Sequence, residues 1–82
     1  MKLPRDLSGL ELAKLIRPYG YEITRQTGSH LRMSSSARGT QHHITIPAHK
    51  ILKVGTLAGI LSEIASYLEI ERSQLEQELF GR

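Results

Sequence analysis

Three short motifs place histidine, serine and glycine where they could act together on a ligand. The first, Gly28-Ser29-His30, lies between two runs of alternating polar and apolar residues, which are typical of β-strands. It is followed along the chain by two further motifs, Pro47-Ala48-His49 and Gly55-Thr56-Leu57. Imidazole titrates near neutral pH and can accept or donate a proton, so His30 is the candidate general acid or base.

Length and composition limit the kind of protein that can carry these motifs. We expect a single domain spanning residues 1–82, with a modest hydrophobic core. The chain has no cysteine, which excludes disulfides, thiolate zinc sites and cysteine nucleophiles. Its start does not resemble a signal peptide and no apolar run is long enough to cross a membrane, so we expect a cytoplasmic protein with no membrane partner.

Charge is distributed unevenly along the chain. Residues 1–56 hold four lysines and five arginines against three acidic residues, a net charge of +6. Residues 57–82 hold two arginines against five glutamates, a net charge of −3. A basic surface of this kind favours a polyanionic partner, although charge alone also fits an ordinary solvated surface.

Periodicity predicts a helix at the start of the chain and a second helix after the third motif. Ser8 and Glu11 form a capping box for the first helix, and Pro18 ends it. Apolar residues at helical spacing from Leu57 to Leu68 predict the second helix, with Thr56 as its N-cap.

A short third helix is predicted near the C-terminus. It carries Leu75 and Leu79, and Gly81 is a plausible stop. Glu71 and Ser73 are alternative caps for its start.

Three strands are predicted between the first two helices, over residues 21–26, 29–33 and 42–46. Residues 27–28 form a tight connection, and residues 34–41 are expected to be a mobile hairpin loop. The fold class is therefore α+β: a three-stranded antiparallel sheet with helices on one face.

Alternation along the strands assigns each side chain to one face of this sheet. The side chains expected to point to the core are those of Tyr21, Ile23, Leu31, Met33, Ile44 and Ile46. The side chains expected on the open face are those of Glu22, Thr24, Gln26, His30, Arg32, His43 and Thr45. One imidazole on an open, cationic sheet face points to a single-histidine ribonuclease.

The chain resembles the HicA family of toxins from bacterial toxin–antitoxin systems, from about Leu7 to about Leu79. The resemblance rests on the order and spacing of short segments: Gly20-Tyr21, Arg25 to His30, Ile46 to His49, and Gly55-Thr56-Leu57 with Ile60-Leu61 behind it. It implies a double-stranded-RNA-binding-domain-like fold, α-β-β-β-α with an extra short C-terminal helix here.

The resemblance also implies a function. Members of the family are messenger-RNA interferases of type II systems, which cleave RNA without a metal or other cofactor and inhibit growth. The catalytic histidine of the family follows Gly-Ser and falls on His30. A HicB-type antitoxin covers the active face. Many members carry a second histidine after the first, where this chain has Leu31.

In such a reaction the ribose 2′-hydroxyl attacks the adjacent phosphate, and the expected product is a 2′,3′-cyclic phosphate. His30 could serve as base toward that hydroxyl or as acid toward the departing 5′-oxygen, and the sequence leaves both roles open. The cations expected to contact RNA phosphates are Arg25, Arg32, Lys50 and Lys53.

Four other residues have an expected role near the site. Gly28 suits a turn, and Ser29 either orients the phosphate or begins the strand. His49 is expected to make a structural hydrogen bond near Pro47, with a supporting role in the site as the second alternative. Arg38, on the predicted mobile loop, could close over RNA. Metal binding by the histidines is not expected, because no Asp or Cys accompanies them.

Two further functions remain open from the sequence. The chain could be a non-catalytic RNA-binding module of the same fold, or an interaction protein whose basic face docks an acidic partner.

Overall fold

The computed structural model describes residues 3–81 and shows a helix, three strands and two further helices in chain order. A short 3₁₀-helix, η1, follows the first helix. The bounds are α1 (Gly9–Leu15), η1 (Arg17–Tyr19), β1 (Glu22–Thr27), β2 (His30–Ser35), β3 (His42–Pro47), α2 (Val54–Leu68) and α3 (Arg72–Phe80).

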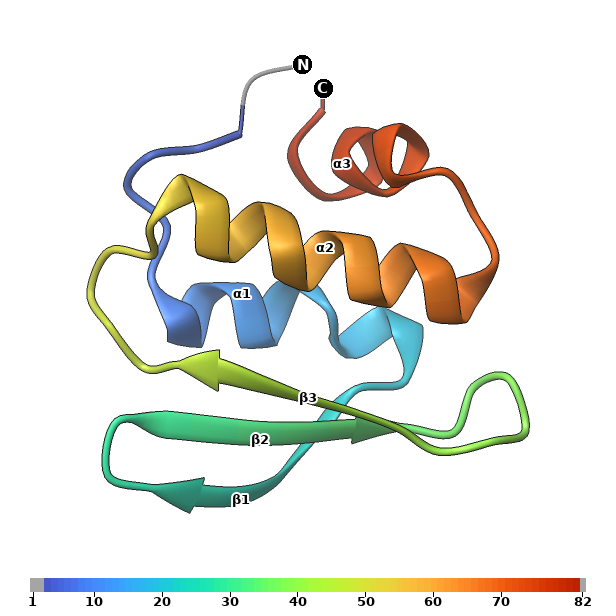
Figure 1. Ribbon diagram of the computed structural model, residues 1–82, viewed down its shortest axis with the longest axis horizontal. Coiled ribbons are helices and arrows are strands. Elements are labelled where there is room, and N and C mark those ends of the chain that lie inside the picture. Colours follow the sequence, from blue (N-terminus) through green and yellow to red (C-terminus); the bar gives the residue numbers. More distant parts are fainter. Residues whose placement is uncertain (1–2, 82) are drawn as a thin grey trace.

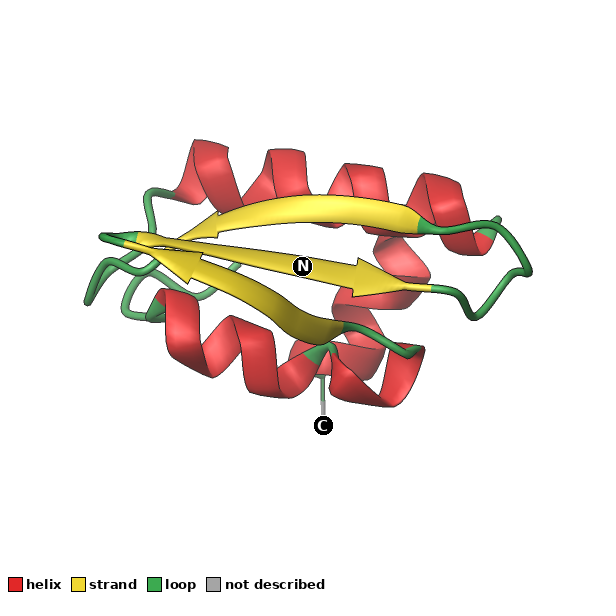
Figure 2. Cartoon of the chain, turned by 90° about the horizontal axis from the view of Figure 1, so that it is seen from below, coloured by secondary structure: helices red, strands yellow, loops and turns green. Residues whose placement is uncertain are grey.

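The three strands form one antiparallel sheet in the order β1-β2-β3, with β2 in the centre. Figure 1 shows α1 and α2 on the same side of this sheet, with α3 packed on the far side of α2. Seen from below in Figure 2, the sheet lies in front of the helices and its other face is uncovered. The architecture confirms the expected α+β class and agrees with a double-stranded-RNA-binding-domain-like fold. In residues 3–81, no helix has the length and apolar character that crossing a membrane requires.

The core lies between the helices and the two strands β2 and β3. Leu31 and Met33 of β2 are fully buried, as are Leu57 and Leu61 of α2. Their positions agree with the predicted alternation, because the buried residues of β2 and β3 are apolar except for Ser35 at the end of β2.

Strand β1 differs from the other two because all six of its residues are exposed. Ile23 was expected in the core, but 40% of its surface remains exposed. It faces the helix side opposite Met33, so the prediction of its direction is correct and that of its burial is wrong. Strand β1 is an edge strand, and it contributes no buried residue to the core.

Local sequence explains where α1 begins, whereas the N-cap of α2 lies three residues before the expected one. The Glu11 backbone N–H donates to Ser8 Oγ at 3.0 Å and the Ser8 N–H donates to Glu11 Oε1 at 2.8 Å, which confirms the capping box. These hydrogen bonds hold the pKa of Glu11 below its usual value.

Thr56 is not the cap of α2: Lys53 occupies that position without a side-chain hydrogen bond, and the helix begins at Val54. Glu71 rather than Ser73 occupies the N-cap of α3.

The loop that joins β2 to β3 is shorter than expected and is anchored to α2. Strand β2 continues to Ser35, so the loop spans residues 36–41. The backbone N–H of Arg38 donates to the hydroxyl of Tyr67 at 2.9 Å, and that hydroxyl donates to the carbonyl of Thr40. Arg38 also forms an ion pair with Glu69 at 2.9 Å. These contacts contradict the expectation of a mobile loop and hold Arg38 at the end of the sheet opposite His30.

The N-terminus of α1 approaches the end of β3 so closely that only glycine fits there. The Gly9 N–H donates to the carbonyl of His49 at 3.0 Å. A Cβ added at Gly9 would overlap the carbonyl oxygen of Pro47. The absence of a side chain at residue 9 therefore sets how tightly α1 packs against this end of the sheet.

We expect Gly9→Ala to lower the free energy of unfolding by about 1–3 kcal/mol, the usual range for overpacking, because the backbone of Pro47 cannot move aside cheaply. Chemical denaturation measures the change. Gly59→Ala is the matched control: residue 59 lies inside α2 with no atom within 4 Å of an added Cβ, so this variant should gain about 0.5–1 kcal/mol. Equal effects of the two substitutions would contradict the close contact.

Candidate functional site

The structure places His30 on the open face of the sheet. It is the first residue of the central strand β2 and its side chain is exposed. Thr27 of β1 and Pro47 of β3 lie directly opposite it. Paired residues in an antiparallel sheet project to the same face, so His30 stands in a row with a threonine and a proline and with no large side chain over it.

A two-residue turn presents His30 at the end of the sheet. Thr27 pairs with His30, so Gly28 and Ser29 alone form the connection. Gly28 has a φ of +54°, the left-handed region that glycine adopts without strain, as the sequence predicted for a turn residue. Ser29 belongs to this turn and does not begin the strand, because β2 starts at His30.

A backbone hydrogen bond joins the first motif to the second. The Ala48 N–H donates to the carbonyl of Ser29 at 2.6 Å. Because the Gly9 N–H holds the carbonyl of His49, the turn, the end of β3 and the start of α1 are fixed to one another. His30 therefore stands on an element whose backbone is held from two sides.

A β-bulge in β1 decides which cations share the face of His30. Ile23 pairs with Met33, but the next pair joins Arg25 to Arg32, so two residues of β1 oppose one residue of β2. Beyond this point the alternation of β1 is reversed. Arg25 therefore faces the same side as Arg32, whereas Gln26, which was expected on the open face, pairs with Leu31 on the helix side.

Arg25 and Arg32 form a cationic pair one row away from His30. Successive residues on one face of a strand are ~7 Å apart along it, so His30 lies within reach of the phosphate that this pair could hold. Within residues 3–81 no carboxylate lies within 4.0 Å of either guanidinium. Two like charges directly opposite each other destabilise a sheet, and an anionic ligand would remove that repulsion.

The other predicted cations lie on the connection between β3 and α2. Lys50 and Lys53 are exposed, and Lys53 is the N-cap residue of α2. A helix N-terminus favours anions because its backbone N–H groups are unpaired. Both lysines lie on the segment that follows Pro47, outside the row of paired residues that contains His30.

His49 makes a structural hydrogen bond near Pro47, as the sequence predicted, but within residues 3–81 its side chain takes no part in it. The bond at this residue is made by its backbone carbonyl, which accepts from Gly9, while the imidazole is exposed. The third motif, Gly55-Thr56-Leu57, forms the first turn of α2, and Leu57 is fully buried. We therefore interpret this motif as part of the helix start and the core.

His43 is a second histidine on the open face, and the predicted alternation placed it there. Its Nδ1 lies 2.5 Å from Ser34 Oγ. His43 pairs with Ser34, two rows from the row of His30, so the two imidazoles do not converge. In residues 3–81, no three His, Cys, Asp or Glu side chains lie together in a way that could hold a metal ion.

Comparison with protein-family models gives one match. The model described as "HicA toxin of bacterial toxin-antitoxin" matches residues 9–65, which include α1, the whole sheet and most of α2. No curated protein matches the chain, and no solved structure does.

We expect Arg25→Gln to raise the free energy of unfolding by about 0.2–1 kcal/mol at low salt, because it relieves the repulsion from Arg32. The gain should shrink at 1 M salt, where charges are screened within about 3 Å. Denaturant titrations at both salt concentrations measure it. Arg38→Gln is the control, and it should lose up to about 1 kcal/mol because Arg38 is paired with Glu69. A loss of stability in Arg25→Gln would contradict the inference that Arg25 and Arg32 repel each other across the two strands.

Proposed function

The chain belongs to the HicA family of toxins of bacterial toxin–antitoxin systems, and on this premise we propose that it is an endoribonuclease that cleaves messenger RNA with His30 as its catalytic residue. Family membership implies a cognate antitoxin. The proposal adds the reaction, the residue that performs it and the face on which it takes place.

One observation carries the proposal: an exposed imidazole stands one row from two arginines that have no carboxylate partner in residues 3–81. The arginines supply the charge that holds a phosphodiester, and the imidazole supplies the proton transfer that its cleavage needs. Figure 2 shows no helix over this face, which leaves room for an extended polynucleotide strand. Two pockets of about 400 and 340 Å³ lie elsewhere, and His30 lines neither.

The proposed step is attack of the ribose 2′-hydroxyl on the adjacent phosphorus. The bond between phosphorus and the 2′-oxygen forms as the bond to the 5′-oxygen breaks, which leaves a 2′,3′-cyclic phosphate and a free 5′-hydroxyl. The 2′-hydroxyl loses a proton and the 5′-oxygen gains one. His30 performs one of these transfers and water performs the other, and Arg25 and Arg32 stabilise the charge on the phosphorane.

The backbone around His30 supports such a role. The Gly28-Ser29 turn is fixed by the hydrogen bond between Ala48 and Ser29, so the backbone from which the imidazole projects is held in place. A held backbone limits the orientations among which the catalytic group must be positioned when the substrate binds. Lys50 and Lys53 would extend the cationic surface beyond Pro47, and the exposed His49 side chain lies on that same segment.

We further propose that a HicB-type antitoxin silences the protein by covering the face of His30. The face is open and its two arginines have no carboxylate partner in the part of the chain that the structure describes, so an acidic protein segment could neutralise the same charges as an RNA strand would.

His30→Ala should reduce the rate of RNA cleavage on the order of 10²–10⁴-fold, the usual contribution of one positioned acid or base. The measurement is cleavage of a labelled RNA, together with growth inhibition on expression. RNA binding should persist, because the two arginines remain. His43→Ala is the matched control, since it removes an exposed imidazole from the same face two rows away, and it should retain cleavage.

Two outcomes would contradict this proposal. Cleavage products that carry 5′-phosphate and 3′-hydroxyl ends would exclude attack by the 2′-hydroxyl. Binding of RNA by the unmodified protein with no cleavage of any RNA would identify a non-catalytic RNA-binding module instead.

The dependence of RNA affinity on salt tests the two arginines separately. Arg25→Gln and Arg32→Gln should each reduce the slope of log K against log salt by about 1, because each removes one phosphate contact. Fluorescence anisotropy with a labelled RNA at several salt concentrations gives the slope. Arg38→Gln should leave it unchanged, since Arg38 is paired with Glu69 at the opposite end of the sheet. An unchanged slope in all three variants would exclude the cationic pair from the RNA contact.

A further inference from the structure

A pocket lies at the end of the sheet opposite His30. An open pocket of about 400 Å³ is lined by His42, Ser62, Glu63, Ser66 and Tyr67. His42 is the first residue of β3, and the other four come from α2. The pocket thus lies between the sheet and the outer side of α2, and no residue of the proposed nuclease site takes part in it.

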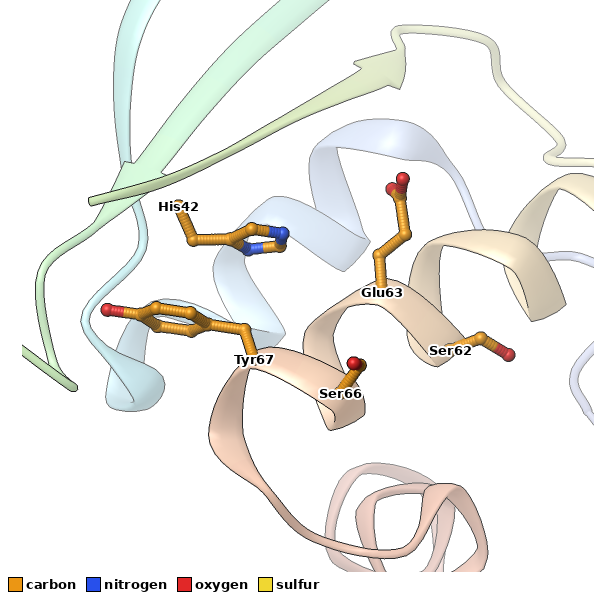
Figure 3. A pocket seen from close by; sticks show the side chains of 5 residues that line it. All are labelled: His42, Ser62, Glu63, Ser66 and Tyr67. Atoms are coloured by element: carbon orange, nitrogen blue, oxygen red, sulfur yellow. The ribbon is translucent and has the colours of Figure 1, made fainter. Parts of the chain in front are cut away.

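Two aromatic rings form one wall of this pocket. The rings of His42 and Tyr67 are nearly parallel, with an interplanar angle of 11° and centroids 4.8 Å apart. Figure 3 shows the imidazole lying over the phenol ring, with the carboxylate of Glu63 beside them. Both rings are half-buried, so part of their surface is available to a ligand.

Hydrogen bonds hold both rings in place. The hydroxyl of Tyr21 lies 2.7 Å from His42 Nδ1. Burial raises the pKa of Tyr21 to about 12, with the neighbouring Tyr67 and Glu63 acting in the same direction, so Tyr21 keeps its proton at neutral pH. The Tyr67 hydroxyl is held by the loop between β2 and β3, through Thr40 and the N–H of Arg38. The stacked pair is therefore a rigid surface.

The rest of the pocket is polar and acidic. Glu63 is exposed and has no ion-pair partner within residues 3–81. At the rim, Ser62 Oγ already accepts a hydrogen bond from the guanidinium of Arg72 at 3.1 Å, and Arg72 is also paired with Glu76 at 3.0 Å. Residues 57–82 carry a net charge of −3, so this part of the chain favours a cation.

We propose that this pocket binds the guanidinium group of an arginine side chain presented by a protein partner. A guanidinium is flat and can stack on the His42–Tyr67 pair while its N–H groups donate to the carboxylate of Glu63. A compact ammonium lacks the flat surface for stacking. A nucleotide would bring its phosphate toward Glu63 in an acidic part of the chain. The pocket therefore favours arginine over both.

Titration with small arginine derivatives, followed by ¹H–¹⁵N NMR of the labelled full chain, tests the site. N-acetyl-arginine-N-methylamide should shift the signals of His42, Glu63 and Ser66 in a saturable way, with a Kd on the order of millimolar, as expected for so small a ligand. The corresponding citrulline derivative has the same shape without the charge and should bind about tenfold more weakly or not at all.

Glu63→Gln should weaken arginine binding about tenfold, because it removes the charged acceptor. Glu71→Gln is the matched control: it removes an equal charge from an exposed residue at the N-cap of α3, outside the pocket, and should bind as the unmodified chain does. The dispersion of the NMR spectrum verifies that each variant is folded.

Three results would overturn the proposal. One is equal binding of the arginine and citrulline derivatives, and another is equal weakening in the two variants. The third is binding of agmatine more than tenfold tighter than the blocked arginine, which would indicate a small-molecule site instead of a protein contact. The outcome is independent of the nuclease proposal, since Glu63→Gln should leave RNA cleavage unchanged.

Discussion

The burial of a single face of the sheet is the constraint on which the rest of this structure depends. Among the three strands only β2 and β3 contain buried residues, and these are among the most buried in residues 3–81. Both α1 and α2 lie on the same face of the sheet, and α3 packs on α2. The opposite face therefore stays in water, and this is why an imidazole and two guanidinium groups can be displayed there without a desolvation cost.

Backbone contacts at the His30 end of the sheet hold the strands of the open face in place. Gly9 allows α1 to approach Pro47 closely, and the hydrogen bond between Ala48 and Ser29 ties the turn before His30 to the same place. The edge strand β1 is held less firmly, because it has no buried residue. Its bulge nonetheless places Arg25 beside Arg32. The backbone of His30 thus starts from a firmly held end of the sheet, while the exposed edge strand carries one of the cations.

Much of the fold could be predicted from the sequence because its signals are local. The capping box at Ser8, the apolar spacing of α2 and the alternation of β2 and β3 each depend on residues a few positions apart. The exposed position of His30 followed from that alternation. The bulge did not, because nothing within β1 marks an extra residue, and Gln26 therefore lies on the helix side instead of the predicted open face. The anchoring of the loop by Tyr67 also depends on residues far apart in the sequence, as does the pocket around Glu63.

The uneven distribution of charge has a consequence for how the molecule meets its partners. Positive charge is gathered in residues 1–56 and negative charge in residues 57–82. In the field of a polyanion, such an asymmetry favours diffusional collisions that begin with the basic part of the chain foremost. The acidic helices α2 and α3 lie on the side of the molecule away from the open face of the sheet, where they stay accessible to a second partner when the first occupies that face.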